Sequence, residues 1–124
     1  MNYQTMLTII PTIQELVRTK LPLKESYALY SLAKEIEGQK DFFLEEEKKL
    51  IEKYNAEVSP EGKITFKDSE NQTAFAKEYF ELNTMEADIK VTLPIVIKMD
   101  SVNGSDLQLS AVDLMSLSGI VDFE

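Results

Sequence analysis

The chain of 124 residues contains no cysteine and no histidine, and each absence excludes a group of functions. Without cysteine there is no disulfide, no thiol nucleophile and no thiolate metal site. Without histidine the chain lacks the usual general base near neutral pH and the commonest metal ligand, which excludes imidazole-based catalysis and most zinc, copper or iron centres. Carboxylates, a lysine nucleophile or a cation held by oxygen atoms are the chemistry that remains. We therefore expect a protein that is not an enzyme and that needs no cofactor.

Positively charged residues are also few. The chain has 22 Asp and Glu against 13 Lys and Arg, which gives a net charge of −9, and Arg18 is the only arginine. Proteins that bind nucleic acid need clustered cations to neutralise phosphates, and an anionic membrane surface would repel this chain. The deficit is largest in residues 55–88, where eight acidic and three basic residues give a net charge of −5. We expect a protein partner, with a basic surface as its natural complement, and neither direct nucleic-acid binding nor membrane binding.

Helix-breaking residues are also sparse, and residues 23–54 contain no proline and one glycine. Apolar side chains recur every seven residues along this stretch, with further apolar residues beside that line: Leu29, Ile36, Phe43 and Leu50, then Leu32, Ala33, Leu44, Ile51 and Tyr54. This spacing predicts one long amphipathic helix. Its apolar stripe must be covered by the rest of the chain or by a second copy.

Local signals predict the segments before the long helix. Residues 1–7 alternate weakly between polar and apolar, which favours a short strand. Thr8 and Pro11 predict a helix over residues 9–20, capped by the threonine and entered through the proline. We expect that helix to bury Ile10, Ile13, Leu16 and Val17. Leu21-Pro22 then ends it, because the residue before a proline is pushed out of helical geometry.

A second helix is predicted to pair with the long one. The Ser-Pro-Glu-Gly sequence at 59–62 is a turn signal, and it predicts a small hairpin over residues 56–67. Ser69 and Gln72 then form a capping-box pattern that opens a helix over residues 69–85. Its apolar side, which we expect to meet Phe43 and Tyr54 in a helical hairpin, consists of Phe75, Tyr79, Leu82 and Met85, with Ala76 and Phe80 adjoining.

The last third of the chain predicts a strand and a short helix. Residues 89–99 alternate strictly, which indicates a strand with one buried face, and Pro94 makes it an edge strand. After an Asn-Gly turn at 103–104, Ser110 and Asp113 open a helix that holds Val112, Leu114, Met115 and Leu117; Gly119 ends it, and Ile120, Val121 and Phe123 fold back. The sequence thus predicts a single α+β domain over residues 1–124. It is a helical hairpin built on the long helix, with a small antiparallel sheet or flap and a short C-terminal helix.

The candidate functional residues are acidic, and no catalytic or ligand-binding motif accompanies them. Glu78, Glu81, Glu86 and Asp88 are the candidate partner-binding residues, and the first two share a helix face. Two other interpretations stay open: the carboxylates hold a divalent cation, in a binding protein or a small enzyme, or they only keep the surface hydrated. Residues 100–106 superficially resemble a calcium loop but lack the third-position ligand and the closing glutamate, which favours a plain turn.

The order of these features resembles a family of small bacteriophage and prophage proteins. Its members share a short helix, a lysine-leucine-proline break as at 20–22, a long charged helix ending near lysine-tyrosine-glycine, and a closing leucine-serine-x-x-acid-leucine helix as at 109–114. Here Asn55 stands where the family has glycine. The resemblance implies a non-enzymatic protein in a phage setting, either a virion or assembly accessory protein or an inhibitor of a host protein. With no signal peptide in the sequence, we expect it in the host cytoplasm or in the virion.

The lengths of the predicted elements also favour self-association. The helix over residues 69–85 is about half as long as the long helix, so the apolar stripe extends beyond it. The predicted edge strand offers a second place for another chain to add. We therefore expect a homo-oligomer, at least a dimer.

Overall fold

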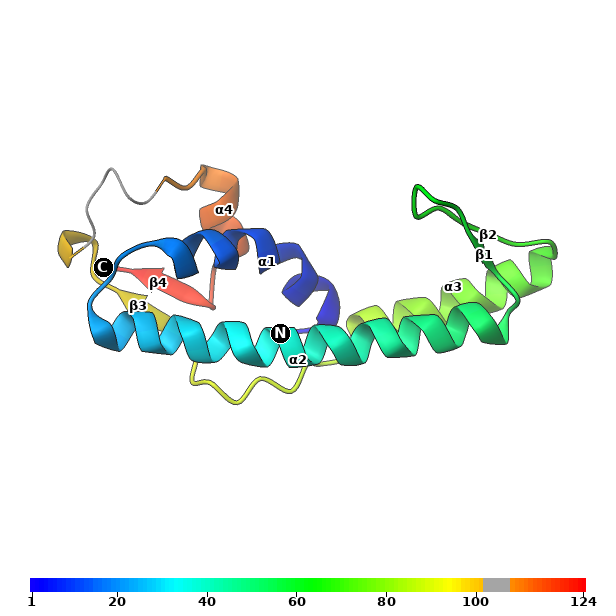
Figure 1. Ribbon diagram of the computed structural model, residues 1–124, viewed down its shortest axis with the longest axis horizontal. Helices are drawn as coiled ribbons and strands as arrows, with labels where there is room; N and C mark the ends of the chain where they lie inside the picture. Colours follow the sequence, from blue (N-terminus) through cyan, green and yellow to red (C-terminus); the bar gives the residue numbers. More distant parts are fainter. Residues whose placement is uncertain (102–107) are drawn as a thin grey trace.

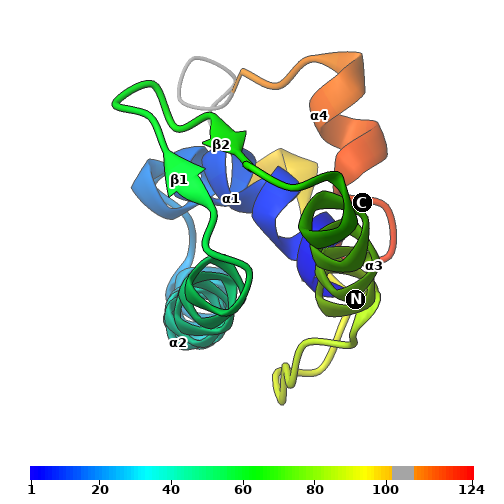
Figure 2. The same cartoon turned by 90° about the vertical axis from the view of Figure 1, so that its right-hand side faces the viewer.

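The computed structural model describes residues 1–101 and 108–124, arranged along one long helix, α2 (Leu23–Lys53) (Figure 1). Helix α1 (Tyr3–Arg18) packs on the first part of α2, and helix α3 (Ser69–Thr84) packs on its second part. Viewed along the long axis, α2 and α3 lie side by side with α1 behind and between them (Figure 2). The fold is α+β, as predicted. In the described residues no helix is both long enough and apolar enough to cross a membrane.

The predicted long helix is confirmed almost to its ends. It begins after Pro22 and is followed by Tyr54, and Asn55 then adopts a φ of 51°, a left-handed conformation that asparagine and glycine tolerate best. Leu29, Leu32, Ile36 and Phe43 are buried, Leu50 is half-buried, and Leu44 is exposed, contrary to prediction. Leu44 differs because one residue turns the helix by about 100°, which carries its side chain from the buried line toward solvent.

The prediction for the first segment was wrong in its element type. The chain enters α1 at Tyr3 because the Asn2 side chain accepts a hydrogen bond from the Thr5 N–H at 2.9 Å, so Asn2 is the helix cap. Pro11 lies inside the helix rather than at its start, with its side chain exposed, and its missing N–H removes one intrahelical hydrogen bond, the one to the Leu7 carbonyl. The helix ends at Arg18, and Val17 is 46% exposed rather than buried.

The hydrophobic core lies between α1, the first two-thirds of α2 and the C-terminal segments. Helix α1 presents residues at three- and four-residue intervals to it, which is the periodicity of one helix face. The most completely buried large side chains are Phe43, Met6, Ile9, Leu16, Leu29, Leu32, Ile97 and Leu117. Side chains from both ends of the chain thus meet on the inner face of α2.

Beyond this core, the second half of α2 continues with α3 as a two-helix arm, which we define as residues 45–86. Strands β1 (Glu57–Val58) and β2 (Ile64–Thr65) pair antiparallel at its far end, as predicted (Figure 1). The cap of α3 is Asp68, whose carboxylate accepts from the Glu70 N–H at 2.8 Å, so Ser69 is the first helical residue rather than the predicted cap.

Aromatic rings join the two helices of the arm, as predicted. Phe75 and Tyr79 stack with ring centroids 5.3 Å apart. Phe75 meets Tyr54 edge-on at 6.4 Å, and Tyr79 lies 6.2 Å from Phe43. Phe80, at 67% exposed, and Met85, at 50%, were predicted near this side but lie largely in solvent.

The predicted strand over residues 89–99 is only partly regular. Strand β3 is Ile95–Ile97, and it pairs in parallel with β4 (Val121–Phe123), a pairing that the predicted antiparallel sheet did not include. The chain from Ala87 to Pro94 is irregular, and it bonds to α2 instead of to a strand: the Glu35 carboxylate accepts from the N–H groups of Lys90 and Val91 at 2.9–3.2 Å. The alternation of burial is nevertheless confirmed through Ile97.

The C-terminal segment closes the core. A 3₁₀ turn (Met99–Ser101) follows β3, and helix α4 (Ala111–Ser116) begins with the predicted capping box between Ser110 and Asp113. Of its predicted buried residues only Leu117 is buried, because α4 touches α1 on one side and leaves Val112, Leu114 and Met115 exposed. Gly119 adopts a φ of 79°, and the chain folds back into β4 as predicted. The predicted turn at 103–104 lies outside the described residues.

Candidate functional site

The four predicted acidic residues do not form one cluster. Glu78 and Glu81 lie on α3, whereas Glu86 and Asp88 lie on the connection that follows it. Within the described residues, no group of three or more acidic side chains is arranged to hold a metal ion. The described residues therefore offer no set of ligands for the cation site that the sequence left open. Most of the calcium-like loop at 100–106 lies outside the described residues.

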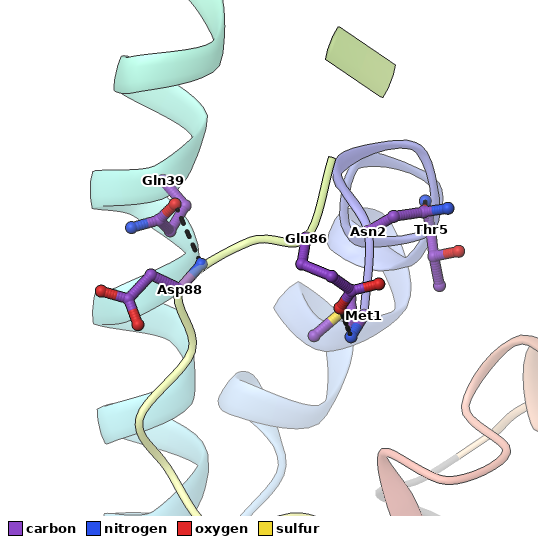
Figure 3. A network of polar contacts seen from close by, with 6 residues as sticks. All are labelled: Met1, Asn2, Thr5, Gln39, Glu86 and Asp88. Atoms are coloured by element: carbon purple, nitrogen blue, oxygen red, sulfur yellow. Dashed lines mark hydrogen bonds and ion pairs between the residues drawn. The ribbon is translucent and has the colours of Figure 1, made fainter. Parts of the chain in front are cut away.

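Glu86 and Asp88 belong to a network that fastens the chain after α3 (Figure 3). The Glu86 carboxylate pairs with the Met1 amino group at 2.8 Å, and the Ala87 N–H donates to the Met1 carbonyl at 3.0 Å. The amide oxygen of Gln39 accepts from the Asp88 N–H at 3.3 Å and from the Tyr3 hydroxyl at 2.6 Å. The Glu86 carboxylate is therefore engaged with the first residue, whereas Asp88 is held to α2 through its backbone N–H.

Glu78 contacts the C-terminal end of α2. Its carboxylate accepts hydrogen bonds from the Lys53 ammonium at 3.0 and 3.3 Å. Hydrogen bonds from the Tyr54 hydroxyl and from Lys53 lower the pKa of Glu78, and the Glu78 carboxylate in turn raises the pKa of Lys53. Both side chains remain in contact with water, so this pair fixes the direction of the Glu78 carboxylate more than it stabilises the fold.

Glu81 is exposed and stands beside Glu78 at the rim of a groove between α2 and α3. The groove has a volume of about 200 Å³. The buried Leu82 and the half-buried Leu50, one from each helix, form its floor, and Glu46, Glu78, Glu81 and the half-exposed Met85 surround it. Glu46 pairs with Lys49 on its own helix, at 3.0 Å. The structure thus joins two of the four predicted residues to a third acid and an apolar depression.

Sequence reasoning missed Glu46 and the apolar floor. The i, i+3 spacing is enough to place Glu78 and Glu81 on one face of a helix. Which residue of the other helix lies opposite depends on the register between α2 and α3, and that register is set by packing of Phe43, Tyr54, Phe75 and Tyr79. A local sequence pattern carries no such information.

Two other hollows lie nearer the first half of α2. One, of about 220 Å³, separates α1 from α2 and is lined by Ile10, Ile13, Gln14, Ala33, Ile36, Glu37 and Lys40. The other, of about 370 Å³, lies between the start of α2 and β3 and is lined by Lys24, Glu25, Ala28, Thr92, Pro94, Ile95, Val96 and Lys98. Both carry lysine together with a single acid, so neither combines an apolar floor with a rim of one charge.

The fold and this site together describe an α+β protein with a projecting two-helix arm and an acid-rimmed groove on it. Comparison of the chain with models of protein families, with curated proteins and with solved structures gives no match.

Proposed function

We propose that the protein is a non-enzymatic interaction module whose arm, residues 45–86, carries the surface that recognises a protein partner. The observation that supports this proposal is the groove whose floor is apolar and whose rim bears three carboxylates from two helices. Interfaces commonly combine a small apolar centre with a polar rim that sets orientation and specificity. The groove has this composition.

The size and charge of the groove favour a protein segment over a metabolite. Pockets that enclose drug-sized ligands usually have volumes of about 300–1,000 Å³, and this one is smaller. It suits one apolar side chain of a larger partner. The arm contains eleven acidic and six basic residues, a net charge of −5, so a partner with lysine or arginine beside that side chain would be attracted from a distance.

The biological setting in the proposal comes from the sequence resemblance. A phage or prophage protein of this kind acts as a virion or assembly accessory protein, or it inhibits a host protein by occupying its basic surface. Both roles need recognition without chemistry, which agrees with the lack of histidine and cysteine.

Affinity capture from a bacterial lysate, with proteins identified by mass spectrometry, tests the proposal. The informative variant combines Glu81→Lys with Met85→Ser, because both side chains line the groove and are exposed, and neither side chain forms an ion pair within the described residues. Glu61→Lys makes the same charge change at the tip of the hairpin, away from the groove, and serves as the matched control. Capture is compared at about 0.1 M and about 1 M salt, where the Debye length is about 10 Å and about 3 Å.

The proposal predicts specific proteins that the wild type and the control retain and that the groove variant loses. Their capture should also decline at the higher salt concentration, because exposed charges are then screened. If the same proteins are retained by all three chains at both salt concentrations, the groove is not the recognition surface.

A further inference from the structure

The first turns of α2 carry an exposed apolar face at the opposite end of the helix from the arm. Leu23, Tyr27 and Tyr30 follow one another at four- and three-residue spacing, which places them on one side of the helix. Their exposed fractions are 85%, 66% and 51%, and the two tyrosine rings lie 6.2 Å apart. We call these three residues the aromatic patch. Large apolar side chains gathered on one exposed face are typical of an interaction surface.

The charge around the aromatic patch is opposite to that of the rest of the molecule. Residues 18–34 contain four basic residues and one acidic residue, a net charge of +3 in a chain whose total is −9. Within the described parts of the chain, Arg18, Lys20, Lys24 and Lys34 form no ion pair. The Lys34 ammonium lies 5.6 Å from the centre of the Tyr30 ring, so a cation sits directly beside the apolar surface.

We propose that the groove on the arm is occupied by the aromatic patch of a second copy of this chain. This inference rests on the proposed function, since it uses the arm as a recognition surface and names its occupant. The groove presents an apolar floor with carboxylates around it, and the patch presents apolar side chains with cations around them. One side chain of the patch, a leucine or a tyrosine, fills the floor, and the flanking cations meet Glu46 and Glu81.

The positions of the two surfaces determine how copies assemble. The patch lies at the N-terminal end of α2, and the groove lies along its C-terminal half, so each molecule carries one of each. At about 100° per residue, Leu50 of the groove lies about half a turn around α2 from Leu23 of the patch, so each molecule meets one neighbour through its patch and another through its groove, and copies associate head to tail. Each contact rests on a few exposed side chains and charges, so the association is weak and strongly dependent on salt.

Sedimentation velocity of the full chain, from micromolar to millimolar concentration, tests this inference. Lys34→Glu removes the cation beside the patch, and Glu81→Lys removes the acid beside the groove; both residues are exposed, and circular dichroism checks that each variant is folded. Each variant should weaken self-association by about fivefold, which corresponds to the upper end of the contribution of an exposed ion pair. Lys40→Glu and Glu61→Lys are matched controls with the same charge changes elsewhere, and they should associate like the wild type.

Mixing the two variants gives the decisive result. An equimolar mixture restores one original contact, Lys34 of the Glu81→Lys chain against Glu81 of the Lys34→Glu chain, so the mixture should associate more tightly than either variant alone. If the mixture stays monomeric, or if the wild type is monomeric throughout, a second copy is not the occupant. Lysate capture that still depends on Glu81 would then leave the proposed function standing, with a different partner in the groove.

Discussion

Replacing Phe43 by alanine should be among the most damaging single substitutions in this chain. Its side chain is 2% exposed, and its ring lies 5.8 Å from the ring of Tyr3 and 6.2 Å from that of Tyr79. The residue therefore joins α1, α2 and α3 at the point where the core becomes the arm. Truncation of a buried phenylalanine costs about 3–5 kcal/mol, the sum of the lost transfer free energy and the cavity left behind.

Urea denaturation followed by helix circular dichroism at 222 nm measures this cost. A protein of this size loses roughly 1–3 kcal/mol of stability per molar urea, so the midpoint should fall by about 2 M. Phe42→Ala is the natural control, because Phe42 is the neighbouring residue of the same type but is 44% exposed. We expect its midpoint to fall by less than half as much.

Equal shifts for the two variants would refute the packing argument. They would mean that the side of α2 that carries Phe42 is buried as deeply as the side that carries Phe43. A cost of less than about 1 kcal/mol for Phe43→Ala would also contradict the structure, because the loss of a buried ring and the cavity that it leaves cost more than that.

Three further predictions concern a cap, a titrating group and a turn. Asp68→Ala should destabilise the protein by about 1 kcal/mol in urea denaturation, whereas Ser69→Ala should cost much less; the reverse order would make Ser69 the cap of α3. Burial and then the hydrogen bond to the Glu47 carboxylate raise the pKa of Tyr79, so this phenol stabilises the fold below its unfolded pKa of about 10, and that contribution is lost as the pH rises through the higher folded pKa. Urea midpoints between pH 9 and pH 11 should therefore fall more steeply for the wild type than for Tyr79→Phe, and parallel profiles would contradict this. Gly119→Ala should cost about 1–2 kcal/mol, because the residue has a φ of 79°, and a neutral thermal melt would count against the turn.

The features that the sequence predicted correctly are those that depend on local or periodic signals. The seven-residue recurrence of Leu29, Ile36 and Phe43 is enough to identify α2, and the spacing of Ser110 and Asp113 is enough to place the cap of α4. The start of α1 was missed because Pro11 is usually a first-turn residue, and only its outward position lets the helix continue through it. Periodicity predicted which helix faces are buried. It failed at Leu44, because a shift of one residue along the helix is enough to move a side chain from the buried face to the exposed one.

The parallel pairing of β3 with β4 could not be predicted in the same way. Ile95 pairs with Val121 across a long stretch of intervening chain, and nothing in either segment specifies the partner. The candidate site shows the same limit. The spacing on one helix was enough to predict that Glu78 and Glu81 lie on the same face. The groove beside them also needs Leu50 of α2, and its position depends on how α2 and α3 are aligned in the folded protein.

The connection after α3 is attached to α2 at regularly spaced positions of the helix. Gln39 and Glu35 are one turn apart on α2, a rise of about 6 Å, and they accept hydrogen bonds from the N–H groups of Asp88 and Lys90, which are two residues apart in the connection. One turn of α2 therefore corresponds to two residues of the connection. Inserting a single residue between Asp88 and Lys90 would break this match, whereas the hairpin tip has no such constraint. We therefore expect these amides to exchange with deuterium as slowly as those of a helix, although the segment has no regular secondary structure.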